Sequence, residues 1–132
     1  MVEKKIVLDT NTVIDLLKGT PKVVSELEKF DVFYLTTTIC GELLFGAKNS
    51  GKKAENESKY RKFIEKCLTL NIDFEISDEY SNIRLNLKKK GKPIPENDIW
   101  IAATCIVNNL ALISRDTDFE NVEGLIFHKL IY

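Results

Sequence analysis

Four carboxylic acids stand out by their positions among the 20 acidic residues of this 132-residue chain. Two of them follow apolar runs that are typical of buried strands: Asp9 comes after Lys5–Leu8, and Asp116 comes shortly after residues 110–113. In open α/β sheets, ligands bind at the carboxyl ends of the strands. If these two strands are neighbours, both side chains lie at the same edge of the sheet. Asp118, in the same polar segment, is an alternative to Asp116.

The other two acids are expected within helices. Asp98 opens the apolar helix predicted for residues 99–107, where an acid more often caps the helix or interacts with its dipole. Glu42 lies one turn into its helix, and no residue three or four positions away is basic, so it has no local ion-pair partner. By itself Glu42 would most often be a solvated acid.

Taken together, four acids at one sheet edge would repel one another unless a cation neutralised them. The set itself contains no histidine or cysteine. A ligand set made only of oxygen atoms favours a hard ion, Mg²⁺ or Mn²⁺. The combination therefore predicts a metal site more strongly than any one of these acids does.

Composition indicates one domain that spans residues 1–132, with 44% hydrophobic residues available for a core. The three cysteines include no CxxC pair, which indicates neither a disulfide framework nor a zinc site. No apolar run approaches the roughly 18 residues that a membrane span needs, so we expect a cytoplasmic protein without membrane contact. A net charge of −1 means that nucleic-acid binding would depend on local basic patches.

Apolar runs alternate with amphipathic segments along the chain, which predicts a parallel sheet with helices on both faces. We expect Ser77 to cap the helix that Gly91 ends. The chain contains neither GxGxxG nor GxxxxGK(S/T), which argues against a dinucleotide site or a P-loop. The five predicted strands cover residues 5–8, 32–35, 71–76, 110–113 and 125–127.

Four segments in this order resemble the PIN-domain ribonucleases: VLDTN, Thr38-x-x-x-Glu42, PENDIWIAAT and LISRDTDFENVEGL. The single-domain length is similar to that of the VapC toxins of bacterial and archaeal toxin–antitoxin pairs. The resemblance implies a three-layer α/β/α sandwich with a five-stranded parallel sheet, and a homodimer. It further implies an Mg²⁺- or Mn²⁺-dependent endoribonuclease, the toxin of a type II pair, held inactive by a cognate VapB-like antitoxin.

The resemblance also assigns roles to individual residues. We expect direct metal binding by Asp9, Asp98 and Glu42, while Asp116 would hold a second ion or an ordered water. The family's four catalytic, metal-binding acids match Asp9, Glu42, Asp98 and Asp116, and its supporting polar positions match Asn11 and Ser114.

Basic residues near these acids are candidate RNA contacts. Arg115 directly precedes Asp116, and Lys52 and Lys53 follow the helix that carries Glu42. Lysines on amphipathic helices more often simply face water. The identity of the RNA is open, since transfer, ribosomal and messenger RNA would all be recognised by shape and charge.

Other function classes fit less well. Phosphoryl-transfer enzymes of the haloacid dehalogenase type need a second acid two residues after the first, and that position is Asn11 here. A response-regulator receiver would need paired acids at the first strand end. The serious alternative is a catalytically silent PIN-fold module that binds RNA or a protein. A groove between the second and third helices could receive an amphipathic helix from a partner.

Overall fold

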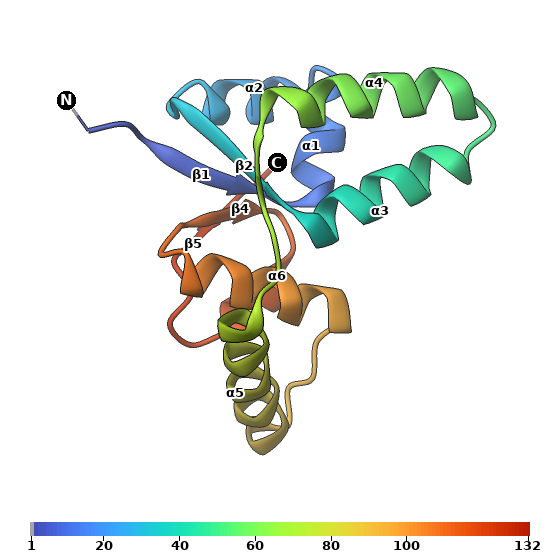
Figure 1. Cartoon of the computed structure of the whole chain (residues 1–132). Helices are drawn as coiled ribbons and strands as arrows, with labels where there is room; N and C mark the ends of the chain where they lie inside the picture. Colours follow the sequence, from blue (N-terminus) through green and yellow to red (C-terminus); the bar gives the residue numbers. More distant parts are fainter. Residues whose placement is uncertain (1) are drawn as a thin grey trace.

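Five parallel strands form one sheet at the centre of the computed structural model, which describes residues 2–132 (Figure 1). The strand order is β3-β2-β1-β4-β5. The first and fourth strands are hydrogen-bonded neighbours, with Val7 opposite Leu112 and Leu8 opposite Ile113. The predicted α/β class and five-stranded parallel sheet are confirmed. The strands are β1 (Lys5–Leu8), β2 (Val32–Thr36), β3 (Leu68–Leu70), β4 (Leu112–Ser114) and β5 (Phe127–Lys129).

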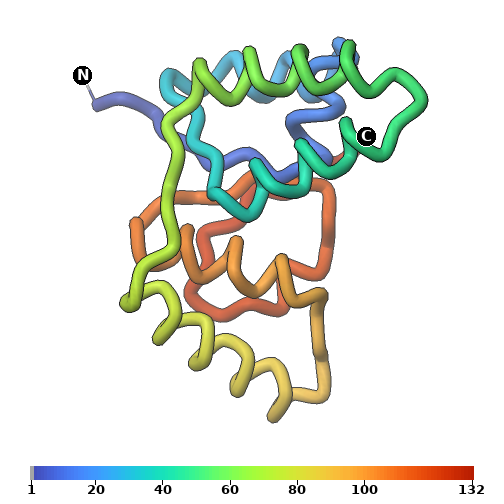
Figure 2. The backbone as a smooth tube through the Cα atoms, turned by 45° about the vertical axis from the view of Figure 1, so that its right-hand side comes forward, coloured from blue at the N-terminus to red at the C-terminus, as the bar shows by residue number. Residues whose placement is uncertain are grey.

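Helices cover both faces of this sheet (Figures 1 and 2). One layer holds α1 to α4, and the other holds α5 and α6; the chain crosses between the layers along β3. The arrangement is the three-layer sandwich expected from the sequence. The helices are α1 (Thr10–Leu17), α2 (Pro21–Leu27), α3 (Thr37–Lys48), α4 (Lys53–Lys66), α5 (Phe74–Lys90), α6 (Glu96–Val107) and the short 3₁₀ helix η1 (Thr117–Asn121).

The core lies on both faces of the central strands. Ile6, Val7 and Leu8 of β1 are fully buried, as expected for a parallel strand covered by helices on both sides. Helix α6 buries seven of its twelve residues, among them Ile101 and Cys105, and packs against α5. Each large apolar side chain buried in this way contributes about 1.5–3 kcal/mol. This core fixes the strand ends and the start of α6, which carry the acids discussed below.

The predicted strand at residues 71–76 is wrong. The edge strand β3 is Leu68–Leu70, and α5 begins at Phe74. Asp73 caps this helix, because its carboxylate accepts a hydrogen bond of 2.9 Å from the backbone N–H of Ile76. The alternating pattern was misleading: Ile76 is buried, whereas the Phe74 side chain is 77% exposed. The cap is therefore Asp73 and not the predicted Ser77.

The other boundaries differ by smaller amounts. Strands β4 and β5 both begin two residues later than predicted, and Gly91 ends α5 as predicted, with a left-handed φ of 67°. The apolar residues Tyr60, Phe63, Ile64, Cys67 and Leu68 have helical spacing, but α4 ends at Lys66, before the last two of them.

The three cysteines, Cys40, Cys67 and Cys105, are free thiols. Within residues 2–132, no helix is both long enough and apolar enough to cross a membrane.

The assignment of Asp73 as a helix cap predicts a stability change. Asp73→Ala should lower the free energy of unfolding by about 1 kcal/mol, because the Ile76 N–H loses its partner at the start of α5. Urea denaturation followed by circular dichroism measures the change. Asp78→Ala, at an exposed position further along α5, is the matched control. Equal stability of the two variants would contradict the cap.

Candidate active site

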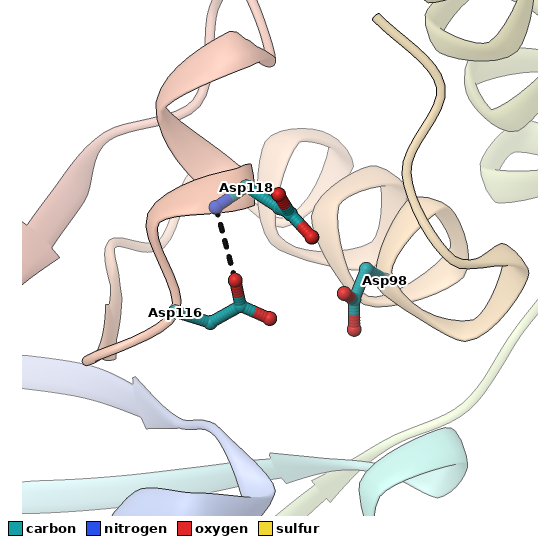
Figure 3. A group of neighbouring side chains, drawn as sticks. All are labelled: Asp98, Asp116 and Asp118. Atoms are coloured by element: carbon teal, nitrogen blue, oxygen red, sulfur yellow. Dashed lines mark hydrogen bonds between the residues drawn. The ribbon is translucent and has the colours of Figure 1, made fainter.

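Five carboxylates from four parts of the fold converge at the carboxyl edge of the sheet. Asp9 follows β1 directly, Glu42 lies in α3, and Asp98 lies in the first turn of α6. Asp116 and Asp118 follow β4. Carboxylate oxygens of Asp98, Asp116 and Asp118 lie within 4.8 Å of one another, and Figure 3 shows their side chains facing a common space. The adjacency of β1 and β4 brings Asp9 to the same edge.

Asp9 is buried and firmly oriented. Its carboxylate is only 5% exposed and accepts a hydrogen bond of 2.6 Å from Ser114 Oγ. Asn11 Nδ2 lies 3.3 Å from the same carboxylate oxygen of Asp9 and 3.3 Å from Ser114 Oγ. The structure thus places the two predicted supporting residues, Asn11 and Ser114, directly against Asp9.

Glu42 is held by two neutral donors. Thr10 Oγ1 donates to one carboxylate oxygen at 2.6 Å, and Asn97 Nδ2 donates to the other at 3.3 Å. Glu42 is therefore not a freely solvated acid, which is what its position in the helix alone would predict. Sequence reasoning did not identify Thr10 or Asn97 as its partners. The only signal was that each residue is adjacent to a predicted acid, Asp9 or Asp98.

The segment after β4 presents two acids rather than one. The backbone N–H of Asp116 donates to Ser114 Oγ at 3.0 Å, and the N–H of Asp118 donates to Asp116 Oδ1 at 2.9 Å (Figure 3). Asp116 therefore caps the short η1 helix, while the Asp118 carboxylate faces Asp98. Asp118 joins Asp116 in the group; from the sequence alone, Asp118 could either substitute for Asp116 or assist it.

Asp98 does not cap its helix. The residue before the first turn of α6 is Pro95, and no side chain makes a capping hydrogen bond there. The Asp98 side chain instead faces Asp116 and Asp118. Asp98 as a whole is only 9% exposed. The capping interpretation that sequence reasoning favoured for Asp98 alone is wrong.

Burial and mutual repulsion raise the pKa values of two of these acids. Burial, followed by the charges of Asp9, Asp116 and Glu42, raises the pKa of Asp98 to about 7. Burial also raises the pKa of Asp9 to about 6, although the hydrogen bond from Ser114 opposes the shift. Both groups thus resist ionisation unless positive charge is supplied.

The donor set fits a divalent cation of the Mg²⁺ or Mn²⁺ type. All five side chains offer oxygen, and hard cations prefer oxygen ligands. Across residues 2–132, none of the ion pairs includes any of these five acids. The group thus has negative charge that no lysine or arginine of the chain neutralises.

The predicted RNA contacts lie in two different places. Lys52 and Lys53 sit at the outer end of the hairpin formed by α3 and α4, away from the sheet edge (Figure 1). Lys48 lies six residues after Glu42 on the same helix, which alone separates the two by about 9 Å along the helix axis. Arg115 is adjacent to the acids in the chain, but its side chain pairs with Asp15. The structure brings neither lysine into the carboxylate group.

Comparison with known proteins agrees with this geometry. The family model described as PIN domain matches residues 6–125. The chain belongs to the PIN-domain family. Ribonuclease VapC2 of Haemophilus influenzae, a curated relative, is 32% identical over 126 residues, covering 92% of this chain and 94% of that protein. The predicted resemblance to the VapC ribonucleases is confirmed.

Solved structures support the same PIN assignment. The VapBC2 complex of Rickettsia felis, bound to a promoter DNA fragment, contains a chain with a TM-score of 0.87 and 25% identity, covering 95% of this chain and 98% of that one. A toxin–antitoxin complex from Klebsiella pneumoniae contains a chain with a TM-score of 0.75 and 27% identity, covering 92% and 95%.

The raised pKa values predict a pH-dependent stability of the metal-free protein. A carboxyl whose pKa is higher in the folded state than in the unfolded state makes the fold less stable as pH rises. For Asp98 this loss begins near the ordinary aspartate pKa of 3.8 and is complete above the raised pKa of about 7. Asp98→Asn should therefore raise the free energy of unfolding above pH 7 by about 1–3 kcal/mol and have little effect below pH 4.

Chemical denaturation in EDTA at a series of pH values measures this difference. Asp78→Asn, which removes an exposed carboxylate in α5, is the control and should have no comparable effect. Adding Mn²⁺ should stabilise the unmodified chain more than the Asp98→Asn variant, because a ligand that binds only the folded state stabilises it. A variant that is less stable than the parent at pH 8 would contradict the repulsion.

Proposed function

We propose that the five-carboxylate group is the active site of a metal-dependent endoribonuclease that hydrolyses RNA phosphodiester bonds. The observation that carries this proposal is the convergence of five acids, two of them buried, that are oriented but not neutralised. Asp9 is fixed by Ser114, and Glu42 by Thr10 and Asn97, yet within the described residues 2–132 no basic side chain forms an ion pair with them. Membership of the PIN family, with VapC ribonucleases among the relatives, supports the assignment.

Asp9, Glu42 and Asp98 are the proposed direct ligands, and Asp116 would hold a second ion or an ordered water. When bound, Mg²⁺ or Mn²⁺ would lower the pKa of the attacking water and stabilise the charge on the leaving 3′ oxygen. The protein's own contribution is to fix its carboxylates before substrate arrives. Hydrogen bonds to the carboxylates keep the ligand oxygens in place and reduce the cost of reorganisation. No side chain is required as a nucleophile.

The alternative of a silent binding module has less support. A module that only binds RNA or protein has no need for two buried acids, Asp9 and Asp98, whose pKa values are raised by burial and by neighbouring carboxylates. Such an arrangement costs stability without a cation, which favours a role in metal chemistry.

We infer that this chain is the toxin of a type II pair, acting in the cytoplasm as a homodimer that a VapB-like antitoxin inhibits. The toxin–antitoxin complex from Klebsiella pneumoniae supports an antitoxin partner. The groove predicted between the second and third helices, α2 and α3, is the expected place for an amphipathic helix of that partner.

RNA cleavage tests the proposal directly. The purified chain should cut members of a panel of transfer, ribosomal and messenger RNAs in Mg²⁺ or Mn²⁺ but not in EDTA. Asp9→Asn and Asp98→Asn should each reduce the rate by roughly 100-fold or more, because each removes a ligand charge at the reacting centre. Denaturing gel electrophoresis of labelled RNA measures the rates.

Asp78→Asn serves again as the control for this assay and should cleave at the unmodified rate. Equal residual cutting by the unmodified chain and by Asp9→Asn would indicate a contaminating nuclease and reject the assignment. If both forms bind RNA but neither cuts it, the silent module becomes the better description.

Asp118 provides a further prediction, because its carboxylate belongs to the close group with Asp98 and Asp116. Asp118→Asn should raise the Mn²⁺ concentration needed for half-maximal cleavage by roughly 10-fold, with a smaller effect at saturating metal. Glu120→Gln, on the same short helix but exposed, is the matched control. An unchanged metal requirement in Asp118→Asn would remove Asp118 from the ligand set.

A further inference from the structure

A third buried acid lies outside the carboxylate group. Among residues 2–132, the buried acids are Asp9, Asp98 and Asp15, and Asp15 is 8% exposed. Its partners are Arg115, whose Nε lies 3.5 Å from Asp15 Oδ2, and Tyr132, whose hydroxyl donates to the same oxygen. A buried carboxylate costs stability unless it is paired and hydrogen-bonded, and Asp15 is both. The question is what this pairing does.

The cluster of Asp15, Arg115 and Tyr132, here called the arginine clamp, adjoins the carboxylate group. Asp15 lies one helical turn after Asn11 on the same side of α1, and Asn11 contacts Asp9. The arginine is the residue between Ser114, which donates to Asp9, and the first acid after β4. The clamp therefore lies about one turn of α1, or roughly 5.4 Å, further along from the contacts that orient Asp9.

The clamp holds Arg115 without using up its hydrogen-bonding capacity. The Arg115 side chain is 55% exposed, and its Cζ lies 5.9 Å from the centre of the Tyr132 ring. Within the described part of the chain, Asp15 is its one ion-pair partner, through Nε. The terminal nitrogens of the guanidinium remain free to donate. Burial and the hydrogen bond to Asp15 raise the pKa of Tyr132 to about 12, so its hydroxyl stays a donor at neutral pH.

An RNA substrate needs a cation at this place. The backbone phosphates on either side of the cleaved one would approach an acidic group that has no ion pair with a lysine or arginine among residues 2–132. Lys52 and Lys53 lie at the outer end of the α3–α4 hairpin (Figure 1). Arg115 directly precedes Asp116 in the chain, and a guanidinium has the planar fork that matches phosphate oxygens.

We propose that Arg115 binds an RNA phosphate next to the one that is cleaved, and that Asp15 and Tyr132 are positioning residues that hold its guanidinium there. This inference rests on the proposed ribonuclease function and names a contact of the same site. The pair with Asp15 fixes the side chain, while stacking against Tyr132 limits its rotation. Preorganisation of this kind lowers the entropic cost of binding.

RNA binding in a cleavage-deficient background tests the clamp. In the Asp98→Asn chain with Mg²⁺, fluorescence anisotropy of a fluorescein-labelled single-stranded RNA gives the Kd at several salt concentrations. R115Q should raise the Kd by about 10-fold and reduce the slope of log K against log salt by about 0.7. K62Q, at an exposed position of α4, is the control and should change the Kd by less than about twofold.

A double-mutant cycle then separates positioning from a merely structural role. D15N should raise the Kd by about 3-fold to 10-fold, but should have no further effect once R115Q is present, because it acts through Arg115. R115K should bind RNA less tightly than the parent, since it keeps the charge but loses the fork. If D15N proves too unstable to study, Tyr132→Phe takes its place in the cycle, because it removes only the hydroxyl that donates to Asp15.

Three results would overturn the proposal. R115Q could bind RNA as tightly as its parent, D15N could weaken binding equally with and without R115Q, or D15N in the otherwise unmodified chain could weaken Mn²⁺ binding. The last result would mean that Asp15 supports the carboxylates instead of Arg115. A chain that cuts no RNA but shows the expected binding pattern would refute the nuclease function and leave the phosphate contact standing.

Discussion

Repulsion among carboxylates that are held together away from bulk water is the constraint on which this site depends. The parallel pairing of β1 with β4 brings Asp9 to the edge where Asp116 lies, and α6 presents Asp98 to the same space. The pKa of about 7 for Asp98 shows that the fold resists full ionisation there. The stability to hold this arrangement comes from the core, where α6 buries most of its residues against the sheet and α5.

Neutral donors orient the acids without cancelling their charge. Ser114 fixes Asp9, and Thr10 fixes Glu42. A lysine or arginine in either place would form an ion pair, lower the pKa of its partner and reduce the affinity for a cation. Hydroxyl and amide donors impose direction while leaving the negative charge available. The choice of donor therefore separates a site built to take up a cation from an ordinary ion-pair network.

The fold was predictable where local pattern and tertiary environment agree. The buried run before Asp9 and the apolar helix α6 are apolar because they are covered on several sides, and this is visible in the sequence. The structure of residues 71–76 was not predictable, because their alternation of apolar residues fits a half-exposed strand as well as the start of a helix. The hydrogen bond from Ile76 N–H to Asp73 decides between them, and a capping aspartate has no unique signal within an acidic segment.

The sequence predicts which acids form the candidate site, but it does not predict which residues hydrogen-bond to them. Asp9 and Asp98 could be singled out by their positions at element boundaries. The contacts that hold the acids join residues far apart in the chain, such as Asn11 with Ser114, and depend on the packing of α1 against β4.

Because of the same packing, two residues of helix α1 make contacts at the site. Its first turn supplies Asn11 to orient Asp9, and its next turn supplies Asp15 to hold Arg115. A cation that swung freely beside the acids would compete with a metal ion for them. Asp15 on α1 pairs with the guanidinium of Arg115, and in residues 2–132 the five carboxylates of the group take part in no ion pair.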